Sequence, residues 1–279
     1  MSALPQPTED PPAPLRWSQA GEGPDVVLLH GAIVERHDLF CALAPGLAAD
    51  FRVTAFDRAG HGQSPFYSPT GSPWRQAQAV RAAVEALGLK KPIVLGHSFG
   101  GAVALAYALQ FADETQGVVA IAPIAFPEMR LEHWVFAPRA LPGWGPLYDA
   151  ALRFGIDPLL LPILRRAMFW PQAPDRPAAQ ATVSAPFRLD FGPVEGQDAW
   201  LLNLGLAASA TRYATCRVPA RVLAGDRDIV VNPALHAGPL ASLLPAAEFR
   251  LLPGLGHMIH HFAPAEIVRA TLELADPPS

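Results

Sequence analysis

The segment around Ser98 constrains the fold of this chain more than any other stretch. The apolar, β-branched run at residues 92–95 predicts a buried strand, and the alanine- and leucine-rich run at 102–109 predicts a helix. Between them lies Gly96-His97-Ser98-Phe99-Gly100. Glycines on both sides of a serine allow a sharp turn from strand to helix, because they remove side chains that would clash there. Such a turn places the Ser98 hydroxyl at a helix start, where free N–H groups favour developing negative charge.

Apolar strands alternate with helical segments on both sides of this turn. The strands are expected at residues 15–18, 25–29, 51–56, 92–95, 117–122, 220–224 and 248–252. The helices are expected at 38–49, 74–87, 102–109, 233–244 and 265–274, with Gly88 as a left-handed cap of the second. Buried strands that alternate with helices form a parallel sheet covered on both faces. The sequence therefore predicts an α/β protein with a mostly parallel, doubly wound sheet.

The alternation stops between residues 124 and 216. This stretch is dense in proline and contains four of the six tryptophans, and short helices are expected at 148–154 and 159–170. It is too long for a structureless loop in a compact domain. We therefore predict a helical cap at 124–216, inserted into an α/β core domain of residues 15–123 and 217–279, with a flexible proline-rich tail at 1–14.

Composition and charge exclude several classes of protein. The chain has 279 residues, of which 51% are hydrophobic and 16% charged, enough for a large core. A net charge of −4 gives no electrostatic basis for a nucleic-acid partner, and no uninterrupted apolar stretch is long enough for stable membrane insertion. Cys41 and Cys216 make neither a disulfide framework nor a metal-ligand spacing. Without the features of a signal peptide, the chain is expected to be cytoplasmic, with no metal or cofactor; its oligomeric state is not predicted.

A serine nucleophile needs a base, and histidine titrates near neutral pH. Among nine histidines, His257 follows Gly256 in the loop after the last expected strand, the end of an α/β sheet where catalytic groups concentrate. We predict that His257 is the base for Ser98. His260 and His261 are expected in the first turn of the next helix or at the pocket rim. A metal site on them lacks a third ligand of suitable spacing.

The base in turn needs a carboxylate to orient it. Asp226 and Asp228 both follow the expected strand that ends at residue 224. Asp226 fits a turn in which it pairs with Arg227, whereas Asp228 lies deeper in the loop, before two apolar residues that can anchor it. We favour Asp228, and Asp226 stays the alternative. Asp57 lies in a glycine-rich loop and is expected to be structural.

These motifs together resemble a known family. Ser98, Asp228 and His257 in this order, with His30-Gly31 after an early strand, are similar to the α/β-hydrolase fold superfamily. Three further segments match its serine-nucleophile lipase/esterase-like branch, which carries an inserted helical cap: residues 57–64, 225–228 and 254–257. The resemblance implies that the backbone amides of Ala32 and Phe99 form an oxyanion hole.

The resemblance also implies an activity. A serine hydrolase of this branch cleaves carboxylic esters through an acyl-enzyme intermediate, and the apolar cap favours a small substrate with a hydrophobic acyl or alkoxy group. C–C bond hydrolases, lactonases and cofactor-free perhydrolases use the same triad, and a non-enzymatic receptor on this fold needs none. Arg188 in the cap is a candidate to bind a substrate carboxylate, as a C–C hydrolase requires. These alternatives stay open.

Overall fold

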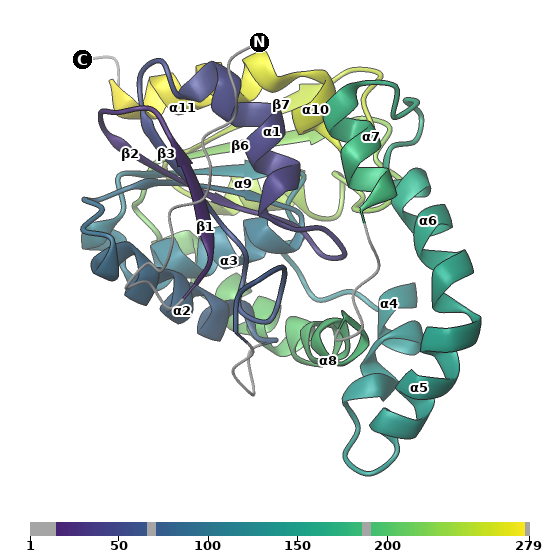
Figure 1. The fold of residues 1–279 in the computed structure, drawn as a ribbon. Helices are drawn as coiled ribbons and strands as arrows, with labels where there is room; N and C mark the ends of the chain where they lie inside the picture. Colours follow the sequence, from purple (N-terminus) through teal and green to yellow (C-terminus); the bar gives the residue numbers. More distant parts are fainter. Residues whose placement is uncertain (1–14, 66–70, 186–190, 277–279) are drawn as a thin grey trace.

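A seven-stranded sheet forms the centre of the molecule, in the order β1-β3-β2-β4-β5-β6-β7 (Figure 1). The computed structural model describes residues 15–65, 71–185 and 191–276. The strands are β1 (Trp17–Ala20), β2 (Asp25–Leu29), β3 (Arg52–Phe56), β4 (Ile93–His97), β5 (Gly117–Ile121), β6 (Ala220–Gly225) and β7 (Ala247–Leu252). Strand β1 pairs antiparallel with β3, and every other pair is parallel. The α/β class with a mostly parallel sheet, predicted from the alternation of strands and helices, is confirmed.

Helices cover both faces of the sheet. Apolar residues of α1 (Arg36–Leu47) and α11 (Pro264–Ala275) form one core cluster with strands β2 to β6. The opposite face packs against α2 (Pro73–Ala86), α3 (Phe99–Gln110) and α9 (Ala237–Leu243). Figure 1 shows α1 and α11 on one side of the sheet and α2 and α3 on the other. The predicted helix at 233–244 is shorter than expected, whereas Gly88 does adopt a left-handed φ of 63° beyond α2.

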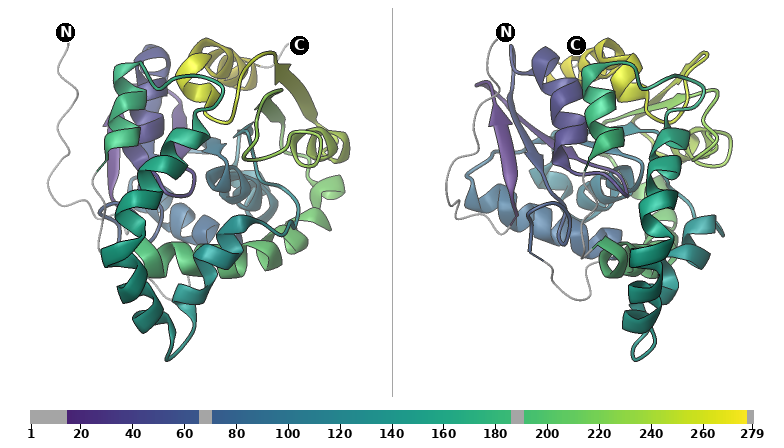
Figure 2. Two further views of the ribbon diagram at one scale, coloured as in Figure 1. Left: turned by 90° about the vertical axis from the view of Figure 1, so that its right-hand side faces the viewer. Right: turned by 45° about the vertical axis from the view of Figure 1, so that its right-hand side comes forward.

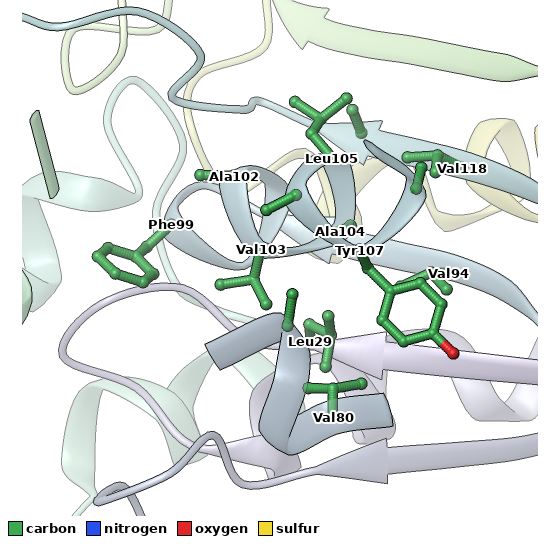
Figure 3. Close-up of a cluster of buried hydrophobic side chains, with 14 of the residues drawn as sticks. Leu29, Val80, Val94, Phe99, Ala102, Val103, Ala104, Leu105, Tyr107 and Val118 are labelled. Carbon is green, nitrogen blue, oxygen red and sulfur yellow. The ribbon is translucent and has the colours of Figure 1, made fainter. Parts of the chain in front are cut away.

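Helix α3 is the buried helix that carries the start of the Ser98 turn. Its residues from Phe99 to Ala108 are all buried, and most are alanine, glycine or valine. Small side chains let the helix lie close to β4 and β5 and to α2 at the same time. Figure 3 shows this packing, with Val103, Val80 and Leu29 meeting below the helix axis and Phe99 at its first turn. The element behind Ser98 is therefore held by contacts around its whole circumference.

The described part of residues 124–216, called the cap below, contains helices and no strand. They are α4 (Leu131–Val135), α5 (Gly145–Gly155), α6 (Asp157–Met168), α7 (Pro177–Ser184) and α8 (Phe191–Ala210). Short 3₁₀ segments are η1 (Ala112–Glu114) before the cap and η2 (Ala137–Ala140) and η3 (Tyr213–Thr215) within it, and α10 (Ile259–Phe262) precedes α11. Figure 2 shows the cap helices in front of the core in its left-hand view.

Helix α8 joins the cap to the core. Its residues Leu202 and Leu206 belong to the core cluster around α3, and the indole N–H of Trp74 on α2 donates a 2.9 Å hydrogen bond to Ser209 Oγ. The expected boundary at residue 216 thus falls after a helix that already packs on the core. Among the described residues, no helix is long and apolar enough to cross a membrane.

Candidate active site

The Ser98 backbone has the strained geometry that the sequence predicts for a strand-to-helix turn. Its φ of 54° and ψ of −116° are rare for a residue with a side chain, and such conformations typically cost about 1–3 kcal/mol. A Cβ on Gly96 would lie 2.1 Å from the Gly100 carbonyl oxygen, and a Cβ on Gly100 would lie 2.1 Å from the Leu29 carbonyl oxygen. Only glycine fits at either position, so the turn holds the start of α3 against the ends of β2 and β4.

His257 and Asp228 form a buried pair beside this turn. The Asp228 Oδ2 atom lies 2.7 Å from His257 Nδ1, and Asp228 Oδ1 accepts 2.8 Å hydrogen bonds from the amides of Val230 and Val231. These bonds leave one carboxylate oxygen aimed at the imidazole. Within the described part of the chain, His257 Nε2 has no hydrogen-bond partner, and His257 lines the same cavity as Ser98. The pair therefore has the arrangement of a base with its orienting acid.

Backbone contacts bring the two loops together. A Cβ on Gly225, the last residue of β6, would lie 2.1 Å from the Leu255 carbonyl oxygen, and the Arg227 amide donates a 2.8 Å hydrogen bond to that same oxygen. The loop after β6 thus runs directly against the loop that carries His257. This contact explains why a glycine must end the strand.

The two other candidate aspartates have different surroundings. Asp226 is partly exposed, accepts a hydrogen bond from the Gly254 amide at 2.6 Å and lies 4.0 Å from Arg227. Asp57 is buried and accepts hydrogen bonds from the Arg36 and Gln63 amides, both at 2.9 Å, and from the Arg36 side chain. Both aspartates therefore stabilise loops, whereas Asp228 is the aspartate that contacts His257.

The predicted oxyanion-hole residues flank the serine. Phe99 is the first residue of α3, and the first amides of a helix have no acceptor within the helix. Ala32 lies on the loop after β2, and a Cβ on the preceding Gly31 would be 3.3 Å from Ser98 Cβ. Ala32, Phe99, Ser98 and His257 all line one cavity. The loop continues through Ile33, whose φ of 56° is unusual for a β-branched residue.

The cavity over Ser98 has a volume of about 490 Å³ and a mostly apolar wall. The cap supplies much of this wall, through Phe136, Leu160, Leu164, Met168, Ala199 and Leu202. The cap tryptophans contribute nothing to it: their exposed fractions run from 47% to 75%, and Trp134, Trp144, Trp170 and Trp200 are absent from the lining. The expectation of an apolar pocket thus fits Phe136 and the aliphatic residues of the cap and not its tryptophans.

A buried charged cluster, which the sequence reasoning missed, adjoins the cavity. It consists of Arg58 and His61 from the core with Glu195 and Asp198 from α8, and both acids line the cavity. Arg58 Nη1 donates a 2.8 Å hydrogen bond to Asp198 Oδ2, and His61 Nε2 lies 3.3 Å from Glu195 Oε1. The available signal in the sequence was the three-residue spacing of the two acids, which places them one turn apart on the same face of a helix. Because the cap sequence shows no clear periodicity, that helix was not predicted.

Burial acts on the two acids of this cluster with different results. Burial raises the pKa of Asp198 above its usual value, although the Arg58 charge opposes the shift. For Glu195 the burial penalty is outweighed by His61, Arg58 and the Ile33 amide, which hold its pKa below the usual value. Of the two acids, Glu195 is therefore the one whose ionised form its surroundings favour.

Two buried groups contain residue types that ligate metals. Asp38, His260 and His261 come together, although no third ligand for the two histidines was expected: Asp38 lies 2.9 Å from His260 Nε2 and 2.8 Å from His261 Nε2. Thr182 donates a further hydrogen bond to Asp38 Oδ1 at 2.7 Å. These hydrogen bonds satisfy the buried carboxylate. The second group, His61 with Glu195 and Asp198, includes the Arg58 guanidinium among its partners, a charge that repels a cation.

A comparison with known families agrees with this architecture. The model of the alpha/beta hydrolase fold family matches residues 24–264, so the chain belongs to this family. The chain is 26% identical over 260 residues to the mouse sn-1-specific diacylglycerol lipase ABHD11, covering 88% of this chain and 79% of that protein. It is 29% identical over 267 residues to the magnesium-chelatase 30 kDa subunit of Rhodobacter capsulatus, covering 90% and 87%.

Solved structures share the fold at lower sequence identity. A thermophilic esterase from Thermogutta terrifontis superposes with a TM-score of 0.73 at 22% identity, covering 94% of this chain and 92% of that one. The 2-hydroxy-6-oxo-6-phenylhexa-2,4-dienoate hydrolase from a Rhodococcus strain gives a TM-score of 0.75 at 21% identity, covering 95% and 96%. Hydrolases with different substrates therefore share this fold. The family and its hydrolase members support the conclusion that this protein is an enzyme.

Proposed function

We propose that the protein is a serine hydrolase that cleaves carboxylic esters through an acyl-enzyme intermediate. One observation carries the proposal: Ser98, on its strained turn, and His257, held by Asp228, line the same apolar cavity. The cavity volume of about 490 Å³ lies within the usual range for small-molecule sites. The mostly apolar wall matches a substrate with a hydrophobic acyl or alkoxy group.

In the proposed reaction, His257 Nε2 takes the hydroxyl proton of Ser98 while the Ser98 oxygen attacks the carbonyl carbon of the ester. The carbonyl oxygen becomes an oxyanion, which the amides of Ala32 and Phe99 stabilise, and each such donor typically contributes about 3 kcal/mol in the transition state. His257 then gives its proton to the leaving alkoxy oxygen, which leaves an acyl group on Ser98. Water, deprotonated by the same base, repeats the attack and releases the acid. Asp228 stays ionised and stabilises the imidazolium.

The charges around the cavity favour a neutral ester over an anionic substrate. Three carboxylates line it, Glu128, Glu195 and Asp198, and Arg130 is the arginine among the described lining residues. Arg130 lies 3.1 Å from Glu128, so its charge is partly compensated. Arg188, the expected partner for a substrate carboxylate, lies outside the described residues. The alternative of a C–C bond hydrolase acting on a keto-acid is therefore the weaker one.

The test combines covalent labelling with turnover. Wild-type protein should react with a fluorophosphonate probe and hydrolyse p-nitrophenyl butyrate, and Ser98→Ala should do neither while keeping its thermal unfolding midpoint. A panel of esters of increasing chain length, a dienoic keto-acid and a lactone then separates the reaction classes. Binding of an ester without turnover by the wild type would instead support a receptor, and faster turnover of the keto-acid would support C–C cleavage.

A further inference from the structure

The loop that carries Ala32 is held by side chains from two parts of the molecule. From the core, Arg58 Nε donates a 3.1 Å hydrogen bond to the His30 carbonyl oxygen, and Arg58 Nη2 donates one of 3.2 Å to the Gly31 carbonyl oxygen. From the cap, Glu195 Oε1 accepts the Ile33 amide hydrogen at 2.9 Å. The peptide groups on both sides of Ala32 are thus fixed by charged, buried side chains.

The two anchors are linked to each other. Arg58 also donates to Asp198, one helical turn from Glu195 on α8, and His61 lies beside both acids. All four side chains are buried. Charge-assisted hydrogen bonds of this kind are shorter and stronger than neutral ones, and in a buried network they restrict the geometry of every member. The position of α8 in the cap is therefore coupled to the conformation of the loop after β2.

Ile33 is the residue where this coupling matters most. Its φ of 56° is strained for a β-branched side chain, and such a conformation persists only where the surroundings enforce it. The Glu195 hydrogen bond to the Ile33 amide is a restraint on that conformation. Without this hydrogen bond, Ile33 can relax toward ordinary φ values. That relaxation would rotate the peptide group between Ala32 and Ile33 and move the adjacent Ala32 amide.

We propose that Glu195 is a positioning residue of the active site, which holds the Ala32 amide in the orientation that stabilises the oxyanion. This inference rests on the proposed acyl-transfer function of Ser98. Hydrogen bonds to an oxyanion depend steeply on donor placement, and removal of a whole donor typically costs about 10²–10³ in kcat. The cap thereby contributes to the chemical step as well as to the walls of the substrate cavity.

Two variants of Glu195 separate positioning from mere packing. Glu195→Gln keeps an oxygen that can accept the Ile33 hydrogen, whereas Glu195→Ala removes it. We expect Glu195→Ala to lower kcat for p-nitrophenyl butyrate by about 10- to 100-fold with KM changed less than about threefold, and Glu195→Gln to retain kcat within about fivefold. An alkyl boronic acid, which forms a tetrahedral adduct with the serine, should lose affinity in Glu195→Ala by a factor close to the loss in kcat.

Asp149→Ala is the matched control. Asp149 is a buried cap carboxylate that pairs with Arg139 and Arg153 and does not line the cavity. Its loss should lower the thermal midpoint and leave kcat within about threefold. Unchanged kcat in Glu195→Ala, or an equal loss in Glu195→Gln, would overturn the positioning role. If wild-type protein neither labels with fluorophosphonate nor hydrolyses esters, the proposed function fails instead, so the two failures are distinct.

Discussion

The core and the cap build the same cavity by different physical means. In the core, the loops after the strands are placed by backbone approaches too close for a side chain, as at Gly100 and Gly225. In the cap, Glu195 and Asp198 reach the site through ion pairs and hydrogen bonds with residues more than a hundred positions away, such as Arg58. Short sequence motifs indicate the close backbone contacts of glycines, but they do not indicate the long-range ion pairs and hydrogen bonds of side chains.

The largest expected effect tests the core loops. Asp228→Asn should lower kcat by about 10³–10⁴-fold, because an amide at this position no longer fixes the productive His257 tautomer or stabilises its imidazolium. Asp226→Asn, two residues earlier in the same loop, should stay within about threefold, since Asp226 contacts the Gly254 amide and Arg227 instead. Steady-state kinetics on one ester measures both. Equal losses of kcat in the two variants would show that the assignment of Asp228 as the acid that orients His257 is wrong.

Most of the core could be predicted from local sequence motifs. Strand and helix positions, the turn at Ser98 and the proximity of the loops after β6 and β7 follow from apolar runs and glycines within a few residues of each other. The sequence favours Asp228 but leaves Asp226 as an alternative, because the choice depends on which carboxylate turns inward, and the amides of Val230 and Val231 determine that. A one-dimensional pattern contains no such direction.

The cap could be predicted only as helical. Its helices α5 and α6 lie close to the expected positions, but which side chains face the cavity depends on packing against the core. The contact between Asp38 and His260 in the core was missed for a similar reason. The two residues are 222 positions apart, so an argument from sequence spacing could not identify Asp38 as a third group beside the two histidines. Long-range polar contacts are thus the part that sequence reasoning missed.

Glycines allow a comparison of stability between the two regions. Gly100→Ala would place a Cβ 2.1 Å from one backbone carbonyl oxygen and 2.5 Å from another, and we expect a loss of about 3 kcal/mol or more in the free energy of unfolding. Gly155→Ala lies at the end of α5, where a Cβ would meet no described atom within 4 Å other than its chain neighbours and the nearby backbone of its own helix; it should be neutral or stabilising by up to about 1 kcal/mol. Urea unfolding followed by circular dichroism measures both, and a tolerated Gly100→Ala would contradict the tight approach.

Acid should lower the stability of the folded state through the buried His260, which lies beside the contact of Asp38 in the core with Thr182 in the cap. Asp38 binds both His260 and Thr182 of α7, and burial lowers the pKa of His260 to about 4. Between pH 6.5 and 4 the unfolded chain takes up a proton that folded His260 does not, so stability falls as pH falls. The loss attributable to His260 between pH 7 and pH 5 is about 2 kcal/mol. Burial lowers the pKa of His97 as well, which adds in the same direction.

His260→Gln provides the control for this pH dependence. Glutamine keeps an N–H that can donate to Asp38 and does not titrate. The free energy of unfolding of this variant should therefore fall less steeply between pH 7 and pH 5 than that of the wild type, in urea titrations at several pH values. Parallel curves would show that the acid sensitivity comes from other groups.

The smallest expected effect concerns the two sides of α6. Leu164 lines the cavity, whereas Leu159 on the same helix is 72% exposed. Leu164→Ala should enlarge the cavity and move the preferred p-nitrophenyl ester toward a longer acyl chain, with a change in relative kcat/KM of about fourfold per added methylene at most, since burying one CH₂ contributes about 0.8 kcal/mol. Leu159→Ala should leave the preference unchanged. If both variants shift the chain-length preference equally, the cap affects substrate choice through its overall stability and not through the side chains that line the cavity. The contrast between a core placed by backbone contacts and a cap placed by side-chain contacts would then not extend to substrate specificity.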